Sequence, residues 1–158
     1  MKAWRGGLWC ISLMVLSFFW LAAGLFAQQP ATEEGRIRFR AVDIYVDSKA
    51  SPLAAYQLEF AATNGVAKIV GIEGGEQPAF HEPPFYDPTA MKHERVILAA
   101  FSTETADKLP TGKTRVATVH LEVVGAIEPE FALELQVAGN LDGTKIPAEA
   151  SFAERNAK

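Results

Sequence analysis

Apolar and polar residues alternate along most of the chain after residue 35. In a β-strand successive side chains point to opposite faces, so a period of two is typical of strands with one buried face. Three runs show this period most clearly. Their apolar faces are Ala54, Tyr56, Leu58 and Phe60 in residues 53–62; Ala117, Val119, Leu121 and Val123 in residues 115–124; and Phe131, Leu133, Leu135 and Val137 in residues 131–137. We expect these faces to form a shared core.

Two further runs predict strands with other surroundings. Residues 95–101 (RVILAAF) are apolar on both faces, as in a central strand that is covered on both sides. In residues 36–46 the apolar positions change phase near residue 41, which predicts a bulge or a strand that passes from one sheet to another. Three arginines alternate with Ile37 and Phe39 at the start of that run and are predicted to face solvent. They are Arg36, Arg38 and Arg40.

Turn signals separate these runs at regular distances. Asn64-Gly65 and Asp142-Gly143 favour a backbone with positive φ, and Gly74-Gly75 and Ser51-Pro52 also break the pattern. No window shows a sustained helical period, although residues 103–109 predict one short helical turn. The spacing favours seven or eight short strands and an all-β fold. We predict an antiparallel β-sandwich over residues 36–153, with residues 154–158 as a frayed tail.

The first 27 residues differ from the rest of the chain. An apolar run follows the basic residues Lys2 and Arg5 and ends in small residues, which is the layout of a secretory signal peptide. Its length, residues 8–27, also suits an uncleaved membrane anchor. We predict a helical signal peptide or anchor over residues 1–27 and a flexible leader over residues 28–35. The domain is then extracytoplasmic, whether secreted, periplasmic or on the cell surface, and meets a membrane only through its N-terminal segment.

Composition narrows the classes of function. All three tryptophans and the single cysteine lie within the first 20 residues, so the predicted mature domain has neither a disulfide nor a cysteine nucleophile. The chain has a net charge of −4, loses Lys2 and Arg5 with the signal, and has no basic patch for nucleic acid. It also has no GxSxG, HExxH or phosphate-loop motif. We therefore expect a domain that is not an enzyme and needs no cofactor.

One segment does not alternate. Residues 74–92 (GGEQPAFHEPPFYDPTAMK) hold four prolines and three aromatic residues, and loops of this length inside a domain are often functional. The candidate partner-binding residues are Phe80, His81, Pro83, Pro84, Phe85, Tyr86 and Asp87. The alternative is that the aromatic side chains plug one end of the sandwich, and the two roles can coexist. His81 and His93 are too far apart for a common zinc motif, so we predict no metal site.

Several strands and turns, taken in order, resemble those of the cohesin family. The matching segments are residues 42–47 (VDIYVD), 53–60 (LAAYQLEF), 94–102 (ERVILAAFS), 109–123 (LPTGKTRVATVHLEV) and 140–143 (NLDG). The resemblance covers about residues 36–152 and implies a jelly-roll sandwich of the kind shared with certain carbohydrate-binding modules. It also implies a module that docks a calcium-loaded, dockerin-like partner at a sheet face. Residues 61–65 (AATNG) replace the Asp-Pro turn of the family, so no contact residue is transferred by position.

A protein partner is the first prediction for the ligand, and a polysaccharide is the alternative. Sugar-binding strips rely on the broad rings of Trp and Tyr, but only Tyr45, Tyr56 and Tyr86 follow the signal, and Tyr56 is predicted to be in the core. A structural role in the cell envelope is a third hypothesis. An exposed edge strand would also allow strand addition by a partner.

Overall fold

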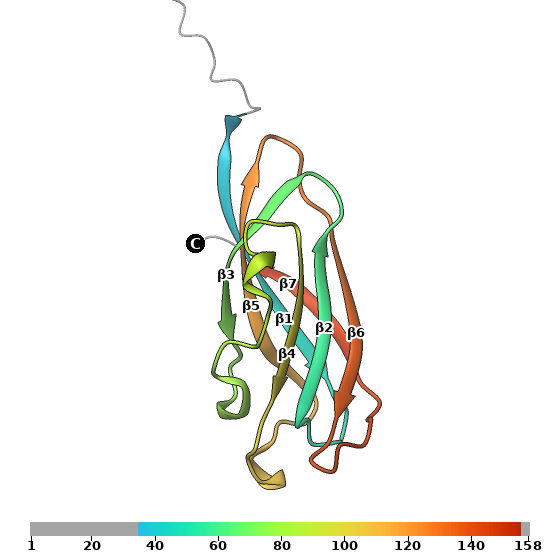
Figure 1. Cartoon of the computed structure of the whole chain (residues 1–158). Coiled ribbons are helices and arrows are strands. Elements are labelled where there is room, and N and C mark those ends of the chain that lie inside the picture. The colour runs from blue at the N-terminus through green and yellow to red at the C-terminus, as the bar shows by residue number, and fades with distance from the viewer. Residues whose placement is uncertain (1–34, 156–158) are drawn as a thin grey trace, which may run out of the picture. The chain divides into compact units, whose positions relative to one another are not determined.

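The alternating runs fold into strands that form two antiparallel sheets packed face to face (Figure 1). This computed structural model describes residues 35–155. Sheet A has the strand order β3-β5-β1-β7 and sheet B the order β4-β2-β6. The strands are β1 (Ile37–Asp47), β2 (Ala55–Ala62), β3 (Val66–Gly74), β4 (Arg95–Phe101), β5 (Lys113–Val124), β6 (Phe131–Gly139) and β7 (Glu149–Arg155). The predicted antiparallel β-sandwich is confirmed for this part of the chain.

The predicted signal peptide or anchor, residues 1–27, lies outside the described residues, as does the leader up to residue 34. Within residues 35–155, no helix is long and apolar enough to cross a membrane. The connections contain short 3-10 helices: η2 (Pro78–Phe80), η3 (Pro88–Ala90) and η4 (Ala106–Lys108). The last of these is the short helical turn predicted within residues 103–109. β7 continues to Arg155, two residues beyond the predicted end of the domain at residue 153.

The core lies between the two sheets and consists largely of the predicted inward faces. The fully buried large side chains include Ile44, Leu58, Phe60, Leu98 and Leu121. Tyr56 is also buried, and its hydroxyl donates a hydrogen bond to the carbonyl of Val116 at 3.1 Å. Since Tyr56 belongs to sheet B and Val116 to sheet A, this bond ties the two sheets together.

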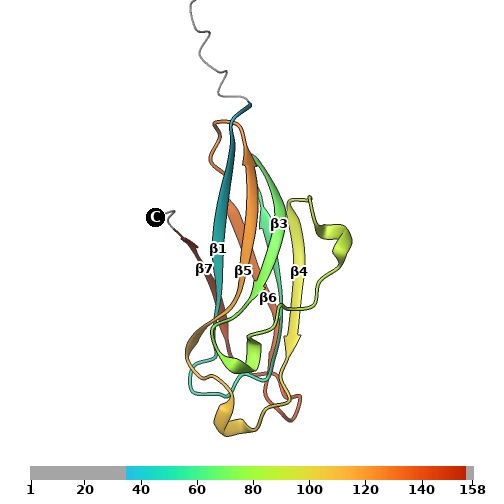
Figure 2. The same ribbon diagram turned by 90° about the vertical axis from the view of Figure 1, so that its left-hand side faces the viewer.

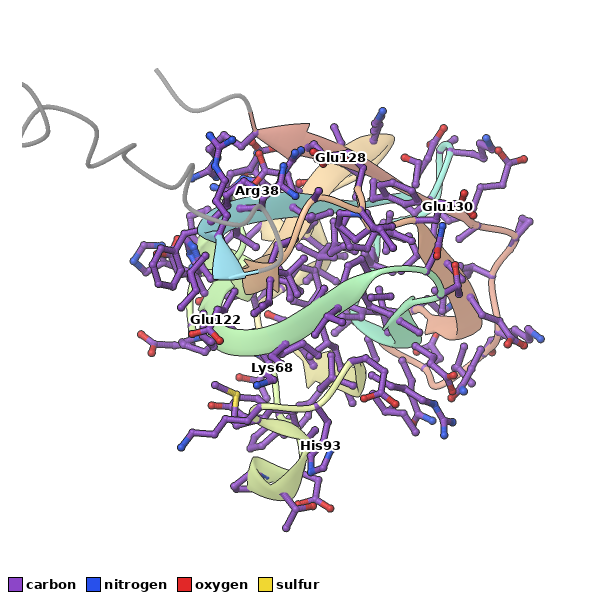
Figure 3. The ribbon with its side chains drawn as sticks, turned by 90° about the horizontal axis from the view of Figure 1, so that it is seen from above. Arg38, Lys68, His93, Glu122, Glu128 and Glu130 are labelled. Carbon is purple, nitrogen blue, oxygen red and sulfur yellow. The ribbon has the colours of Figure 1, made fainter. Side chains whose placement is uncertain are left out.

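The predicted orientation of the start of β1 is wrong. Arg38 and Arg40 share a face with the buried Val42, because the pairing of β1 with β5 is regular from Ile37 to Ile44 and shows no phase change near residue 41. The register shifts only between Ile44 and Tyr45, where β5 has an extra residue, Val116. Both arginines pair with Glu128 at the end of the sandwich (Figure 3). The side chains of Ile37 and Phe39 are exposed instead.

Two other predictions about strand surroundings are corrected. β4 is an edge strand of sheet B and not a central strand, and its outer face is open to solvent at Ile97 and Phe101. Val137 points outward, because the pairing of β6 with β2 skips Gln136 and this bulge reverses the alternation after Leu135. Ala138 takes the inward position that the sequence pattern assigned to Val137.

Candidate binding surface

The connection from β3 to β4, residues 75–94, closes one side of the sandwich. Ile69 of β3 donates a backbone hydrogen bond to His93 at 2.8 Å and accepts one from Lys92 at 2.7 Å. On β4, Ala99 exchanges two backbone hydrogen bonds with Phe85, at 2.7 and 3.0 Å. The connection therefore satisfies backbone groups on the free edges of β3 and β4, which would otherwise be open to pairing.

Glycine allows the start of this connection to fold tightly. A Cβ atom on Gly74 would lie 1.9 Å from the carbonyl oxygen of His81, and one on Gly75 would lie 2.4 Å from the carbonyl oxygen of Arg115. The backbone N–H of Gly75 donates to the carbonyl of Phe80 at 2.6 Å. The close return of the chain brings Phe80 over the core.

The seven predicted site residues divide between the core and the surface. Phe80 is buried and packs edge-to-face against Tyr56, with ring centroids 5.4 Å apart. Pro84 is buried and Tyr86 is half-buried against the core, so these three residues form a plug. The exposed residues are His81, Pro83, Phe85 and Asp87. The buried residues agree with the interpretation of the loop as a plug, whereas binding by the exposed residues stays a prediction.

Asp87 has a local structural contact. Its carboxylate accepts a hydrogen bond from the backbone N–H of Thr89 at 2.8 Å, which caps the 3-10 helix η3. Hydrogen bonds from the backbone and side chain of Thr89 lower the pKa of Asp87 below its usual value. A carboxylate held in this way orders the loop immediately after Phe85 and Tyr86.

Phe85 is the most exposed large apolar side chain in this loop, with 69% of its surface accessible. Its ring stacks on that of Phe101 at a centroid distance of 6.0 Å and an interplanar angle of 11°, and Phe101 is 64% accessible. Because Phe85 pairs with Ala99, its side chain stands on the outer face of sheet B beside Ile97, Ala99 and Phe101. We call these four residues the β4 patch.

Polar groups border the β4 patch along the same face. Arg95 makes a bidentate ion pair with Glu59, with both N···O distances 2.6 Å, and the hydrogen bonds from Arg95 lower the pKa of Glu59. Next to Ala99, Gln57 donates to Gln136 at 2.5 Å. An apolar centre with a polar border is typical of protein-binding surfaces.

Ile97 and Phe101 are not among the surface residues that the sequence predicts. The segment RVILAAF is apolar on both faces, and this pattern predicts burial on both sides although one of its faces is exposed. Among residues 35–155, no group of three or more His, Cys, Asp or Glu side chains is arranged to hold a metal ion.

Comparisons of the chain with family models, with curated proteins and with solved structures found no match. The resemblance to cohesins accordingly stays a prediction.

Proposed function

We propose that this chain is an exported, non-enzymatic binding module that docks a protein partner at the β4 patch. The observation that carries the proposal is the exposed, parallel pair of rings of Phe85 and Phe101. Two backbone hydrogen bonds between Phe85 and Ala99 fix this pair on the sheet. An aromatic pair held in place before binding loses little entropy when a partner covers it.

The finer parts of the proposal come from the sequence. Export rests on the signal-like residues 1–27, and the jelly-roll, cohesin-like character and the dockerin-like partner rest on the resemblance. A partner that matches the β4 patch has an apolar surface with polar groups at its rim. If the partner resembles a dockerin, calcium is required on the partner's side and its removal weakens binding.

The test compares the full chain with a Phe85→Ser/Phe101→Ser variant and with the control Phe39→Ser. Phe39 is an equally exposed phenylalanine, 71% accessible, but lies on the outer face of sheet A. Proteins captured from envelope and secreted fractions are identified, purified and titrated against each form with and without a calcium chelator. We expect the double variant to bind the purified partner roughly 100-fold more weakly and the control to bind within twofold of the original chain.

Equal binding by the original chain and the double variant contradicts the assignment of the β4 patch. Loss of binding in the Phe39→Ser variant alone would place the binding surface on the outer face of sheet A instead of at the β4 patch.

A polysaccharide is the second candidate ligand. Two parallel aromatic rings on an open sheet face, with the amides of Gln57 and Gln136 on the same face, provide both stacking and hydrogen-bonding groups. Retention of the chain on an insoluble polysaccharide, and its loss in the Phe85→Ser/Phe101→Ser variant, would favour this ligand over a protein.

A further inference from the structure

The second side of the sandwich, formed by β6 and β7, lacks a covering segment among the described residues. In Figure 2 β7 lies at one border of the molecule and β4 with its covering loop at the other. Sheet A has one strand more than sheet B, and β6 is the edge of sheet B on the side of β7. Residues 131–136 of β6 together with Phe152 of β7 form this open edge, which we call the β6 margin.

Inward-facing side chains at the β6 margin are incompletely covered. Phe152 pairs with the fully buried Ile44 and so shares the inner face of sheet A, yet 39% of its surface is accessible. It contacts Phe131 edge-to-face at 6.0 Å. Leu133 and Leu135 also point inward and are only partly buried. An apolar inner face without a cover is the surface that one more strand in sheet B would bury.

Backbone groups at the β6 margin are free to accept such a strand. The backbone N–H of Thr63 donates a hydrogen bond to the carbonyl of Glu130 at 2.8 Å. In the ladder between β2 and β6, the backbone groups of Glu130, Ala132 and Glu134 therefore point toward β2. The N–H and C=O groups of the alternate residues, which point away from β2, belong to Phe131, Leu133 and Leu135. Only the far end of this edge is covered, by the pairing of Gly139 with Lys145. Residues 131–136 have no second strand partner within the described chain.

The exposed glutamates at the β6 margin favour basic side chains on an added strand. Glu130 and Glu134 are exposed, and neither side chain has a partner in the described residues. Glu134 points outward, so a residue directly opposite it on an added strand lies beside its carboxylate. Opposite charges in such cross-strand pairs stabilise a sheet and like charges destabilise it. Basic side chains therefore fit the outward positions of the added strand.

We propose that the β6 margin binds one extended segment of another protein, which adds antiparallel to β6 as a fourth strand of sheet B. The segment has apolar residues opposite Phe131, Leu133 and Leu135 and basic residues opposite Glu130 and Glu134. The acidic leader of this chain (QQPATEE, residues 28–34) lacks that pattern. A second copy that adds antiparallel through its own β6 presents the segment EFALELQ (residues 130–136), which has no basic residue to lie opposite Glu130 or Glu134. This inference goes beyond the proposed function, because the margin is at the opposite edge of sheet B from Phe85.

The test uses a fluorescent peptide with the central sequence Thr-Val-Lys-Val-Thr-Val-Lys and the full chain in detergent solution. In the antiparallel arrangement its first residue lies opposite Gln136 and its last opposite Glu130. A peptide of the same residues without alternation (Val-Val-Val-Thr-Thr-Lys-Lys) controls for partition into detergent, because it cannot place its valines on one face. Anisotropy should show saturable binding below about 1 mM for the alternating peptide only.

Two protein variants separate the margin from general charge effects. Glu134→Lys should weaken binding of the alternating peptide roughly fivefold. Glu82→Lys makes the same change of charge in the exposed loop on the other side and should leave binding within twofold. Amide exchange by NMR should show new protection at Phe131, Leu133 and Leu135 when the peptide binds.

Absence of binding, equal binding of both peptides, equal effects of both variants, or protection at other strands would overturn the proposal. Dimerisation of the chain that protects the same amides without peptide would also overturn it, and would identify a second copy as the occupant. None of these outcomes bears on the β4 patch, whose test uses different residues.

Discussion

Gly74 is the residue on which closure of the loop between β3 and β4 most depends. A Cβ atom at this position would lie 1.9 Å from the carbonyl oxygen of His81, a distance that only a backbone shift can relieve. Gly74→Ala should lower the free energy of unfolding by about 3 kcal/mol, measured by urea denaturation. The matched control is Gly71→Ala in the same strand, where the nearest atom is a side-chain atom of His120 at 3.5 Å. Equal effects of the two substitutions would contradict the close approach.

Asp43 links β1, β5 and β7 on the outer face of sheet A. Its carboxylate accepts hydrogen bonds from the hydroxyl of Thr118 at 2.7 Å and the guanidinium of Arg155 at 2.6 Å. Burial by itself raises the pKa of Asp43, but the hydrogen bonds from Arg155 and Thr118 and the charges of Arg155 and Arg115 outweigh it. The pKa in the folded protein is therefore below the usual value of 3.8.

The sign of the resulting pH dependence follows from this lowered pKa. Ionised Asp43 stabilises the fold at pH values above its unfolded pKa, and the stabilisation is lost as the pH falls through the folded pKa. Asp43→Asn should reduce the free energy of unfolding by about 2 kcal/mol at pH 7, and should reduce the difference between pH 7 and pH 3. Asp107→Asn, on the exposed turn η4, is the control and should change neither quantity by more than about 0.5 kcal/mol. A pH dependence unchanged by Asp43→Asn would refute this assignment.

At the scale of elements, the bulge in β5 is fixed from the opposite sheet. Val116 is the extra residue that shifts the register between β1 and β5, and its carbonyl accepts the hydrogen bond of the buried Tyr56 hydroxyl. Tyr56→Phe should cost about 1 kcal/mol in urea denaturation, because a buried carbonyl loses its donor while the packing of the ring is kept. Tyr45→Phe is the control, since Tyr45 lies on the outer face of β1 under the ammonium group of Lys113. A similar cost for both would mean that the bond to Val116 contributes nothing.

Strand positions were largely predictable, since alternation located all or part of β1, β2, β5 and β6, and the continuous apolar run of residues 95–101 located β4. β3 and β7 were not delineated, because the segments VAKIVGIEG and EASFAER lack a regular contrast between their faces.

A period of two also separates the two faces of a strand without showing which of them is buried. Arg38 and Arg40 turn inward because Glu128 and Glu154 neutralise them at the end of the sandwich. That charge pairing depends on residues about 90 or more positions away in sequence.

The candidate site was predictable only in part for a related reason. Proline and aromatic content marked residues 74–92, but which rings are buried depends on the return of the chain at Gly74. Phe80 enters the core at that point, whereas Phe85 is turned outward by its pairing with Ala99. Bulges had a similar effect on Val137, whose direction was reversed by one unpaired residue in β6.

For the molecule as a whole, the two edges of sheet B should differ in amide exchange. The N–H groups of Ala99 on β4 and Leu133 on β6 both point away from the central strand β2. Ala99 donates to the carbonyl of Phe85 at 3.0 Å, whereas Leu133 has no such partner in the described residues. We expect the Ala99 amide to exchange on the order of 100-fold more slowly than that of Leu133 when both are followed by NMR.

The Gly74→Ala variant provides the control for this comparison. If the loop is what protects β4, its opening should raise the exchange rate of Ala99 toward that of Leu133 and leave Leu133 unchanged. Slow exchange at Leu133 in the original chain would mean that the β6 margin is already occupied, and it would then have no free backbone groups for a partner. Fast exchange at both amides would mean that Phe85 is not held on the sheet, and the fixed aromatic pair that supports the β4 patch would be lost.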